Sequence, residues 1–137
     1  MNKKFIVISI FCLLFSFFSC SKKTPEDVVK QYYKYVIKKE YRKALKLIDF
    51  GGPVEDEKFQ KMIEDMEKDY SGDNSIERFE IISSESSIVK IDEKEVEKVE
   101  IKTRFFTKKS PKGEETDFSL YKNDNGEWKI YINFGTK

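Results

Sequence analysis

The spacing of apolar residues changes at about residue 75, and this change constrains the fold more than any other feature of the sequence. Before it, apolar residues recur every three to four positions, as they do along one face of a helix. After it, they alternate with polar residues, as they do in strands that bury one face. Helices that precede strands indicate an α+β domain. We therefore expect N-terminal helices packed on a curved antiparallel sheet of four to five strands.

Three helices are expected before the change. Thr24-Pro25-Glu26-Asp27 is typical of a helix start, because threonine can accept hydrogen bonds from the first amides and proline fits the first turn. The stripe that follows is centred on Val29, Tyr32 and Val36. A second, short helix is indicated by Tyr41, Ala44, Leu45 and Ile48, and it should end before Gly51-Gly52-Pro53. A third stripe consists of Phe59, Met62, Ile63 and Met66.

Alternation after residue 75 predicts strands at 78–81, 99–105, 116–120 and 128–134. Ser110–Gly113 and Asn123–Gly126 predict hairpin turns between the last three. Residues 83–96 are harder to place: Ile88, Val89 and Ile91 could extend a strand, while 92–95 is typical of a turn. Phe106 and Tyr131 fall on the faces that we expect to be exposed.

The first twenty residues have the layout of an export signal. Lys3 and Lys4 precede an apolar run of 14 residues, Phe5–Phe18. As a helix this run would span about 21 Å, less than the roughly 30 Å hydrocarbon core of a bilayer. Ser19-Cys20 follows, and the next residues are polar. This pattern resembles a bacterial lipoprotein signal, in which the cysteine is lipidated and becomes the first mature residue.

The resemblance implies a signal peptide at 1–19, a tether at 20–23 and one α+β domain at 24–137. Cys20 would attach the lipid, and the short tether would hold the domain close to the membrane, with the domain facing the periplasm. Cys12 would leave with the signal, so the mature chain would have no disulfide. Cleavage near Ser21 by the ordinary signal peptidase and an uncleaved anchor are the alternatives.

Composition excludes several kinds of chemistry. The chain has no His and two Cys, so Ser-His-Asp catalysis, Cys-His catalysis and a zinc site are excluded. A formal net charge of +1 on 137 residues argues against nucleic acid as the main partner, because binding to phosphates requires clustered positive charge. We expect no cofactor and no metal.

Three segments resemble a family of small bacterial lipoproteins that contain a domain of unknown function, sometimes labelled lumazine-binding-like. The segments read T-P-E-D-V-V-x-x-Y-Y, E-Y-x-x-A-L-x-L-I and N-x-N-G-E-W-K-I, and the resemblance covers residues 24–50 and 95–134. This family falls in the broad nuclear-transport-factor-two-like (cystatin-like cone) group, which includes ketosteroid isomerase and scytalone dehydratase. The resemblance implies a sheet curved around a long helix, forming a cone with a cavity.

Inward positions of such a cone would line a pocket or fill a core. The candidate lining is Tyr32, Val36, Phe79, Phe105, Phe118 and Trp128, and the further inward positions are Val29, Ile101, Leu120 and Ile130. Enzymes of the group need an acid in the cavity. Here the strand acids fall on the charged face, and Glu40 and Asp49 are the acids nearest the expected cavity mouth.

We therefore expect a lipid-anchored envelope protein. Its domain would bind a small apolar ligand or another envelope protein without catalysis. The alternative is a small cavity enzyme, an isomerase, dehydratase or hydrolase.

Cys20→Ala should abolish incorporation of a palmitate analogue and block maturation of the precursor, because the thiol is the expected site of lipid attachment. Labelling is measured in cells that express the chain, with Cys12→Ala as the matched control. Labelling that survives Cys20→Ala would show that the lipoprotein assignment is wrong.

Overall fold

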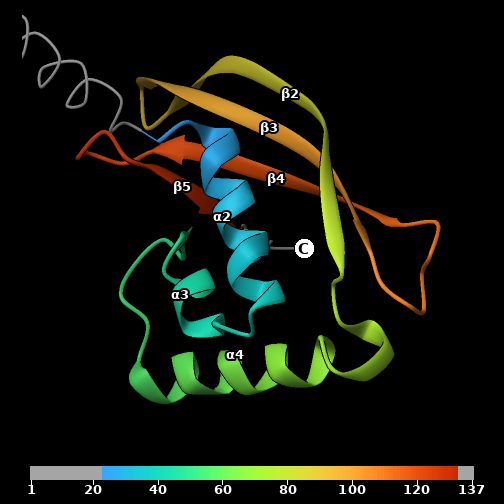
Figure 1. Cartoon of the computed structure of the whole chain (residues 1–137). Coiled ribbons are helices and arrows are strands. Elements are labelled where there is room, and N and C mark those ends of the chain that lie inside the picture. Colours follow the sequence, from blue (N-terminus) through green and yellow to red (C-terminus); the bar gives the residue numbers. More distant parts are fainter. Residues whose placement is uncertain (1–22, 133–137) are drawn as a thin grey trace, which may run out of the picture.

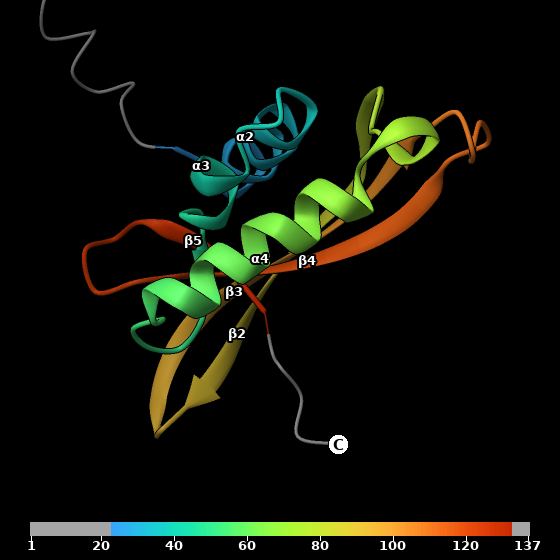
Figure 2. The ribbon, with the colours of Figure 1, turned by 90° about the horizontal axis from the view of Figure 1, so that it is seen from below.

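A computed structural model describes residues 23–132 and shows an α+β domain, which confirms the expected fold class. The signal peptide and Cys20 lie outside the described residues. In chain order the elements are α2 (Pro25–Ile37), α3 (Tyr41–Leu45), β1 (Ile48–Asp49), α4 (Asp56–Asp69), the 3-10 turn η1 (Gly72–Asn74), β2 (Arg78–Ile91), β3 (Lys94–Phe106), β4 (Glu114–Lys122) and β5 (Trp128–Tyr131). The strands curve around α2, and α4 lies across one end of the domain (Figures 1 and 2).

Helix α2 begins at the expected cap. The amide of Asp27 donates to the Thr24 hydroxyl over 3.2 Å, and the amide of Thr24 donates to the Asp27 carboxylate over 3.1 Å. Two backbone donors are thus satisfied at the helix start. The predicted centre of the buried face is wrong at one residue. Tyr33 is buried, with 2% of its surface exposed, whereas Tyr32 is only partly buried.

The second helix is shorter than predicted, and this changes the sheet. Helix α3 ends at Leu45, and Ile48 lies in β1. Ile48 is aligned in parallel with Ile130 of β5, and the amide of Ile130 donates to the Leu47 carbonyl over 2.9 Å. The prediction of a purely antiparallel sheet is therefore wrong at this edge. The five strands form a mixed sheet in the order β1-β5-β4-β3-β2.

The segment that was hard to place forms the far end of a long hairpin. Ile88, Val89 and Ile91 extend β2, which pairs with β3 along its length except for a register shift between Ile81 and Ser83. The turn consists of Asp92 and Glu93, with φ angles of 48° and 66°. Positive φ at both central residues is what a two-residue type I′ turn requires.

Phe106 is buried, with 9% of its surface exposed, so its predicted exposure is wrong. The guanidinium of Arg78 lies over its ring, with the Arg78 Cζ 3.5 Å from the ring centroid. Gly113, at φ +89°, approaches so closely that a Cβ there would lie 2.9 Å from Phe106 Cε1. The loop after β3 therefore covers a face of the strand that the alternation of apolar and polar residues predicts to be exposed. Tyr131 is 39% exposed, as expected.

Glu93→Gly should stabilise the domain by about 1 kcal/mol, because glycine occupies positive φ without the steric cost that other residues pay. Urea unfolding would measure the change. Glu95→Gly, two residues further on in β3, is the matched control and should destabilise, since glycine weakens a strand interior. A loss of stability in Glu93→Gly would contradict the turn geometry.

Candidate functional site

The tyrosine pocket is a cavity of about 220 Å³ between α2, the end of α4 and the sheet. Its walls include Tyr32, Tyr33, Tyr70, Phe105, Thr116 and Phe118. Tyr32 and Tyr33 come from α2, and Tyr70 is the residue that ends α4. The other three come from β3 and β4. Three separate parts of the chain thus meet around one aromatic space.

Ring contacts hold the walls of the tyrosine pocket. Tyr33 stacks on Phe79 with ring centroids 4.6 Å apart. Phe118 meets both Tyr32 and Tyr33 edge-on, each at 5.6 Å between centroids. Stacked and edge-on pairs add to the free energy gained by burial alone. Phe79 therefore supports the pocket from behind Tyr33.

A chain of hydrogen bonds ties Tyr33 to the sheet. The Thr103 hydroxyl donates to the Thr116 carbonyl over 3.0 Å, and it lies 2.6 Å from the Tyr33 hydroxyl. A threonine hydroxyl has a single proton. Because that proton is directed at Thr116, the Tyr33 hydroxyl donates to Thr103.

The remaining hydroxyls of the pocket are neutral hydrogen-bonding groups. Tyr32 and Tyr70 also influence each other's pKa. Burial raises the pKa of Tyr32 and of Tyr70, and it raises the pKa of Tyr33 to about 12. The pocket therefore presents aromatic edges and uncharged phenols at any physiological pH.

Carboxylates lie at the margin of this pocket or away from it. Asp117 lines it and is exposed to solvent. Glu40 forms an ion pair with Lys43 over 3.1 Å, and the Asp49 carboxylate accepts from the Gly51 amide over 2.8 Å. Within residues 23–132, no group of three or more His, Cys, Asp and Glu side chains could hold a metal ion.

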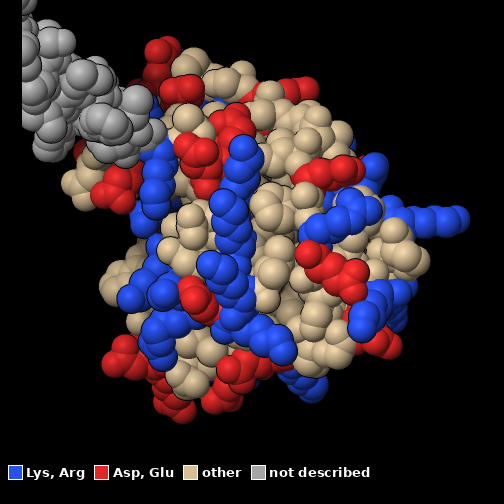
Figure 3. Space-filling view, in the orientation of Figure 1, with Lys and Arg blue, Asp and Glu red and all other residues tan. Residues whose placement is uncertain are grey.

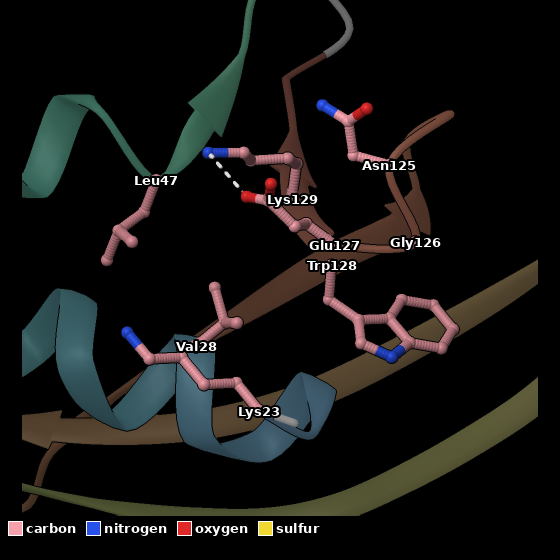
Figure 4. A pocket seen from close by; sticks show the side chains of 8 residues that line it. All are labelled: Lys23, Val28, Leu47, Asn125, Gly126, Glu127, Trp128 and Lys129. Atoms are coloured by element: carbon pink, nitrogen blue, oxygen red, sulfur yellow. Dashed lines mark ion pairs between the residues drawn. The ribbon is translucent and has the colours of Figure 1, made fainter. Parts of the chain in front are cut away.

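A second hollow, the Trp128 cleft, lies where α2 starts. It has a volume of about 400 Å³ and is lined by Lys23, Val28, Leu47, Trp128 and residues of the β4–β5 turn. Figure 4 shows Lys23 and Val28 coming from the start of α2 and Trp128 from the start of β5. The Lys122 ammonium lies 5.3 Å from the centroid of the indole. Trp128 is partly buried and packs against the core.

The six predicted lining residues therefore separate into three groups. Tyr32, Phe105 and Phe118 line the tyrosine pocket. Phe79 packs behind it, and Val36 is core, 3% exposed. Trp128 lines the other cleft. The further inward positions, Val29, Ile101, Leu120 and Ile130, are buried as expected.

The candidate lining predicted from the sequence did not include Tyr33, Tyr70 or Thr103. Tyr33 lies four residues after Val29, so the spacing of the helix could have identified it. Thr103 lies on the inward face of the strand predicted at 99–105, but nothing in the sequence indicates that its hydroxyl bridges to Tyr33. Tyr70 comes from an element whose place against the sheet depends on the tertiary fold.

No family model, no curated protein and no solved structure matches this chain. In the part of the chain that the structure describes, no helix has the length and apolar character needed to cross a membrane.

Thr103→Val should destabilise more than Tyr33→Phe. Valine leaves the Tyr33 hydroxyl and the Thr116 carbonyl without their partner, which costs about 1–3 kcal/mol. Phenylalanine leaves the Thr103–Thr116 bond intact and costs about 0.5–1.5 kcal/mol. Denaturant unfolding of both variants and of the double variant would measure the order. Equal losses would contradict the assignment of Tyr33 as donor.

Alkaline pH should destabilise the fold through the buried tyrosines. The unfolded chain loses phenol protons near pH 10, whereas folded Tyr33 keeps its proton until about pH 12. Between these values the folded state binds more protons, so the free energy of unfolding falls as pH rises. Tyr33→Phe should show a shallower fall in urea unfolding between about pH 9 and 11. An identical slope in the variant would show that Tyr33 is not the group responsible.

Proposed function

We propose that this chain is a lipid-anchored protein of the bacterial cell envelope whose domain binds a small apolar ligand in the tyrosine pocket without transforming it. The observation that carries the binding role is the pocket itself. Its walls are aromatic and aliphatic, and burial raises the pKa of Tyr32 and of Tyr33, which keeps these two phenols neutral. Apolar walls with a few placed polar groups are the usual composition of a ligand site.

The size of the pocket limits the ligand. At about 220 Å³ it is smaller than the 300–1,000 Å³ typical of sites for drug-sized molecules. An engineered apolar cavity of about 150 Å³ accepts benzene. A single ring or short aliphatic group with one hydrogen-bonding atom therefore suits this pocket. An aromatic or aliphatic side chain from another envelope protein offers the same chemistry.

Binding without catalysis is favoured by where the acids lie. The enzymes of the fold group that the resemblance implies rely on a carboxylate or a Tyr-Asp pair within the cavity. In the tyrosine pocket the lining carboxylate among the described residues is Asp117, which is exposed. The phenols hold their protons tightly, because burial raises the pKa of each. They are suited to donating hydrogen bonds to a bound molecule.

The anchor is supported by the sequence at the N-terminus. Cys20 follows the apolar run Phe5–Phe18 and one small residue, and the first turn of α2 begins only five residues later. Such a short tether keeps the domain beside the membrane. The absence of an acidic run directly after Cys20 favours the periplasmic side over surface export.

NMR titration of the full chain with phenol and with benzene tests the binding role. Amides of β3 and β4 near Phe105 and Phe118 should shift, with phenol binding more tightly because it can exchange hydrogen bonds with the tyrosines. Thr116→Leu fills the pocket and should abolish the shifts. Asn125→Ala lies at the Trp128 cleft and should leave them unchanged.

Shifts that survive Thr116→Leu would contradict a site in the tyrosine pocket. If neither probe binds, cross-linking from the pocket in native envelopes would decide whether a protein side chain occupies it. An absence of both kinds of occupant would overturn the binding role.

A further inference from the structure

Part of the concave face of the sheet lies beyond the start of α2. Side chains in one row across β3, β4 and β5 are buried beneath the helix: Val99, Leu120 and Ile130 are aligned and are 4%, 0% and 2% exposed. The next row outward has Ile88 aligned with Glu97 and Lys122 aligned with Trp128. Ile88 is 64% exposed, and Trp128 is only partly buried. On β3 to β5 exposure thus rises within one row, whereas β2 is exposed in both rows, at Ser86 and at Ile88.

The reason for this boundary is the position of the helix start. The Ser84 hydroxyl donates to the carboxylate of Glu26, in the first turn of α2, over 2.6 Å. Strand β2 continues seven residues past Ser84, to Ile91. At about 3.3 Å per residue, the hairpin extends about 23 Å beyond this contact. No helix of the described chain covers that extension, and Figure 1 shows the hairpin tip toward the same end of the domain as the start of α2.

This end is also where the chain leads to the proposed anchor. Lys23 lines the Trp128 cleft, and Cys20 lies three residues before Lys23 in the sequence. Three residues reach at most about 11 Å. A lipid on Cys20 therefore brings the bilayer to the side of the molecule that carries Lys23, Ile88, Lys122 and Trp128. We call these four residues the anchor-end surface.

The chemistry of the anchor-end surface suits the headgroup region of a bilayer. Tryptophan is enriched there because its ring is apolar and its N–H is polar. Lysine extends an apolar stem toward lipid and keeps its ammonium in water. The Lys122 side chain runs beside Trp128, and its ammonium lies over the indole ring.

We propose that the anchor-end surface lies in the headgroup region of the membrane that holds the anchor, with Trp128 in contact with lipid. This inference rests on the proposed lipid anchor at Cys20. It adds a second point of attachment and so fixes the orientation of the domain. The long axis of α2 then points away from the membrane, and the tyrosine pocket faces the aqueous side.

A rival orientation would use the outer face of α2. Lys30, Lys34 and Lys38 are exposed on this helix at intervals of four residues, and Figure 3 shows a band of basic side chains along it. A domain lying flat would place these lysines on anionic lipid. The two orientations put different residues in contact with the bilayer, so one measurement can distinguish them.

Trp128 is the one tryptophan of the whole chain, so the intrinsic fluorescence reports on this side chain alone. Protein expressed from the full sequence, purified from membranes and reconstituted into phosphatidylethanolamine–phosphatidylglycerol vesicles, should emit at shorter wavelength than in detergent-free buffer. Replacing part of the lipid with phosphatidylcholine brominated near the headgroup should remove most of this emission. The matched variant, Trp128→Phe combined with Lys34→Trp, moves the reporter to the middle of α2 and should be unaffected.

The outcomes separate the two proposals. The mass of the N-terminal peptide of the same preparation shows whether Cys20 is acylated. Acylated protein with unquenched Trp128 would overturn the contact and leave the anchor standing, and quenching at position 34 alone would support the flat orientation instead. Quenching of Trp128 in protein with unmodified Cys20 would support the contact and overturn the anchor. Unmodified Cys20 with no quenching would overturn both.

Discussion

The bridge from Tyr33 through Thr103 to the Thr116 carbonyl holds the helical half of the molecule on its sheet. It joins α2 to β3 and, through the backbone, to β4, in a region where Tyr33 and Thr103 are almost wholly excluded from solvent. Hydrogen bonds in such surroundings are expensive to leave unmade, so they fix geometry more strictly than apolar contact does. The stack of Tyr33 on Phe79 extends the same attachment to β2. The position of α2 in turn determines which parts of the concave face are filled and which stay open.

Two open regions result, and they come closest along β5, where Lys129 lines the Trp128 cleft and Ile130 lines the tyrosine pocket. The Trp128 cleft lies at the row of Lys122, and the tyrosine pocket reaches Thr116 on the same strand. Six residues of strand correspond to about 20 Å, which is the distance along β4 between the far ends of the two regions. Such spacing allows one end of the domain to meet lipid while the other meets a soluble ligand, as we propose. Neither role requires the other site to change shape.

Much of the fold was predictable because local rules determine it. The capping box at Thr24, the hairpin turns at Ser110–Gly113 and Asn123–Gly126 and the alternation along β3 to β5 all act within a few residues. The errors arise where residues distant in the sequence determine the local structure. Ile48 has spacing that suits a helix, yet it pairs with Ile130, and Phe106 is covered by Arg78 and the Gly113 loop. The candidate site was predicted in part, since apolar spacing identified Tyr32, Phe105 and Phe118. Apolar spacing could not show that Trp128 lies in a separate cleft. Which rows of the curved sheet are covered by α2 depends on where along the sheet the helix begins.

The pairing of β1 with β5 has a consequence for the order in which the chain can fold. The two partners, Ile48 and Ile130, are 82 positions apart, and the Tyr33–Thr103 contact spans 70. Contacts between distant residues form slowly, because the loop between them must first close. The helices therefore lack their apolar partners until nearly the whole chain is present. For the exported protein that we propose, this delay is useful, since a chain that cannot complete its core early remains extended enough to be threaded through a translocation channel.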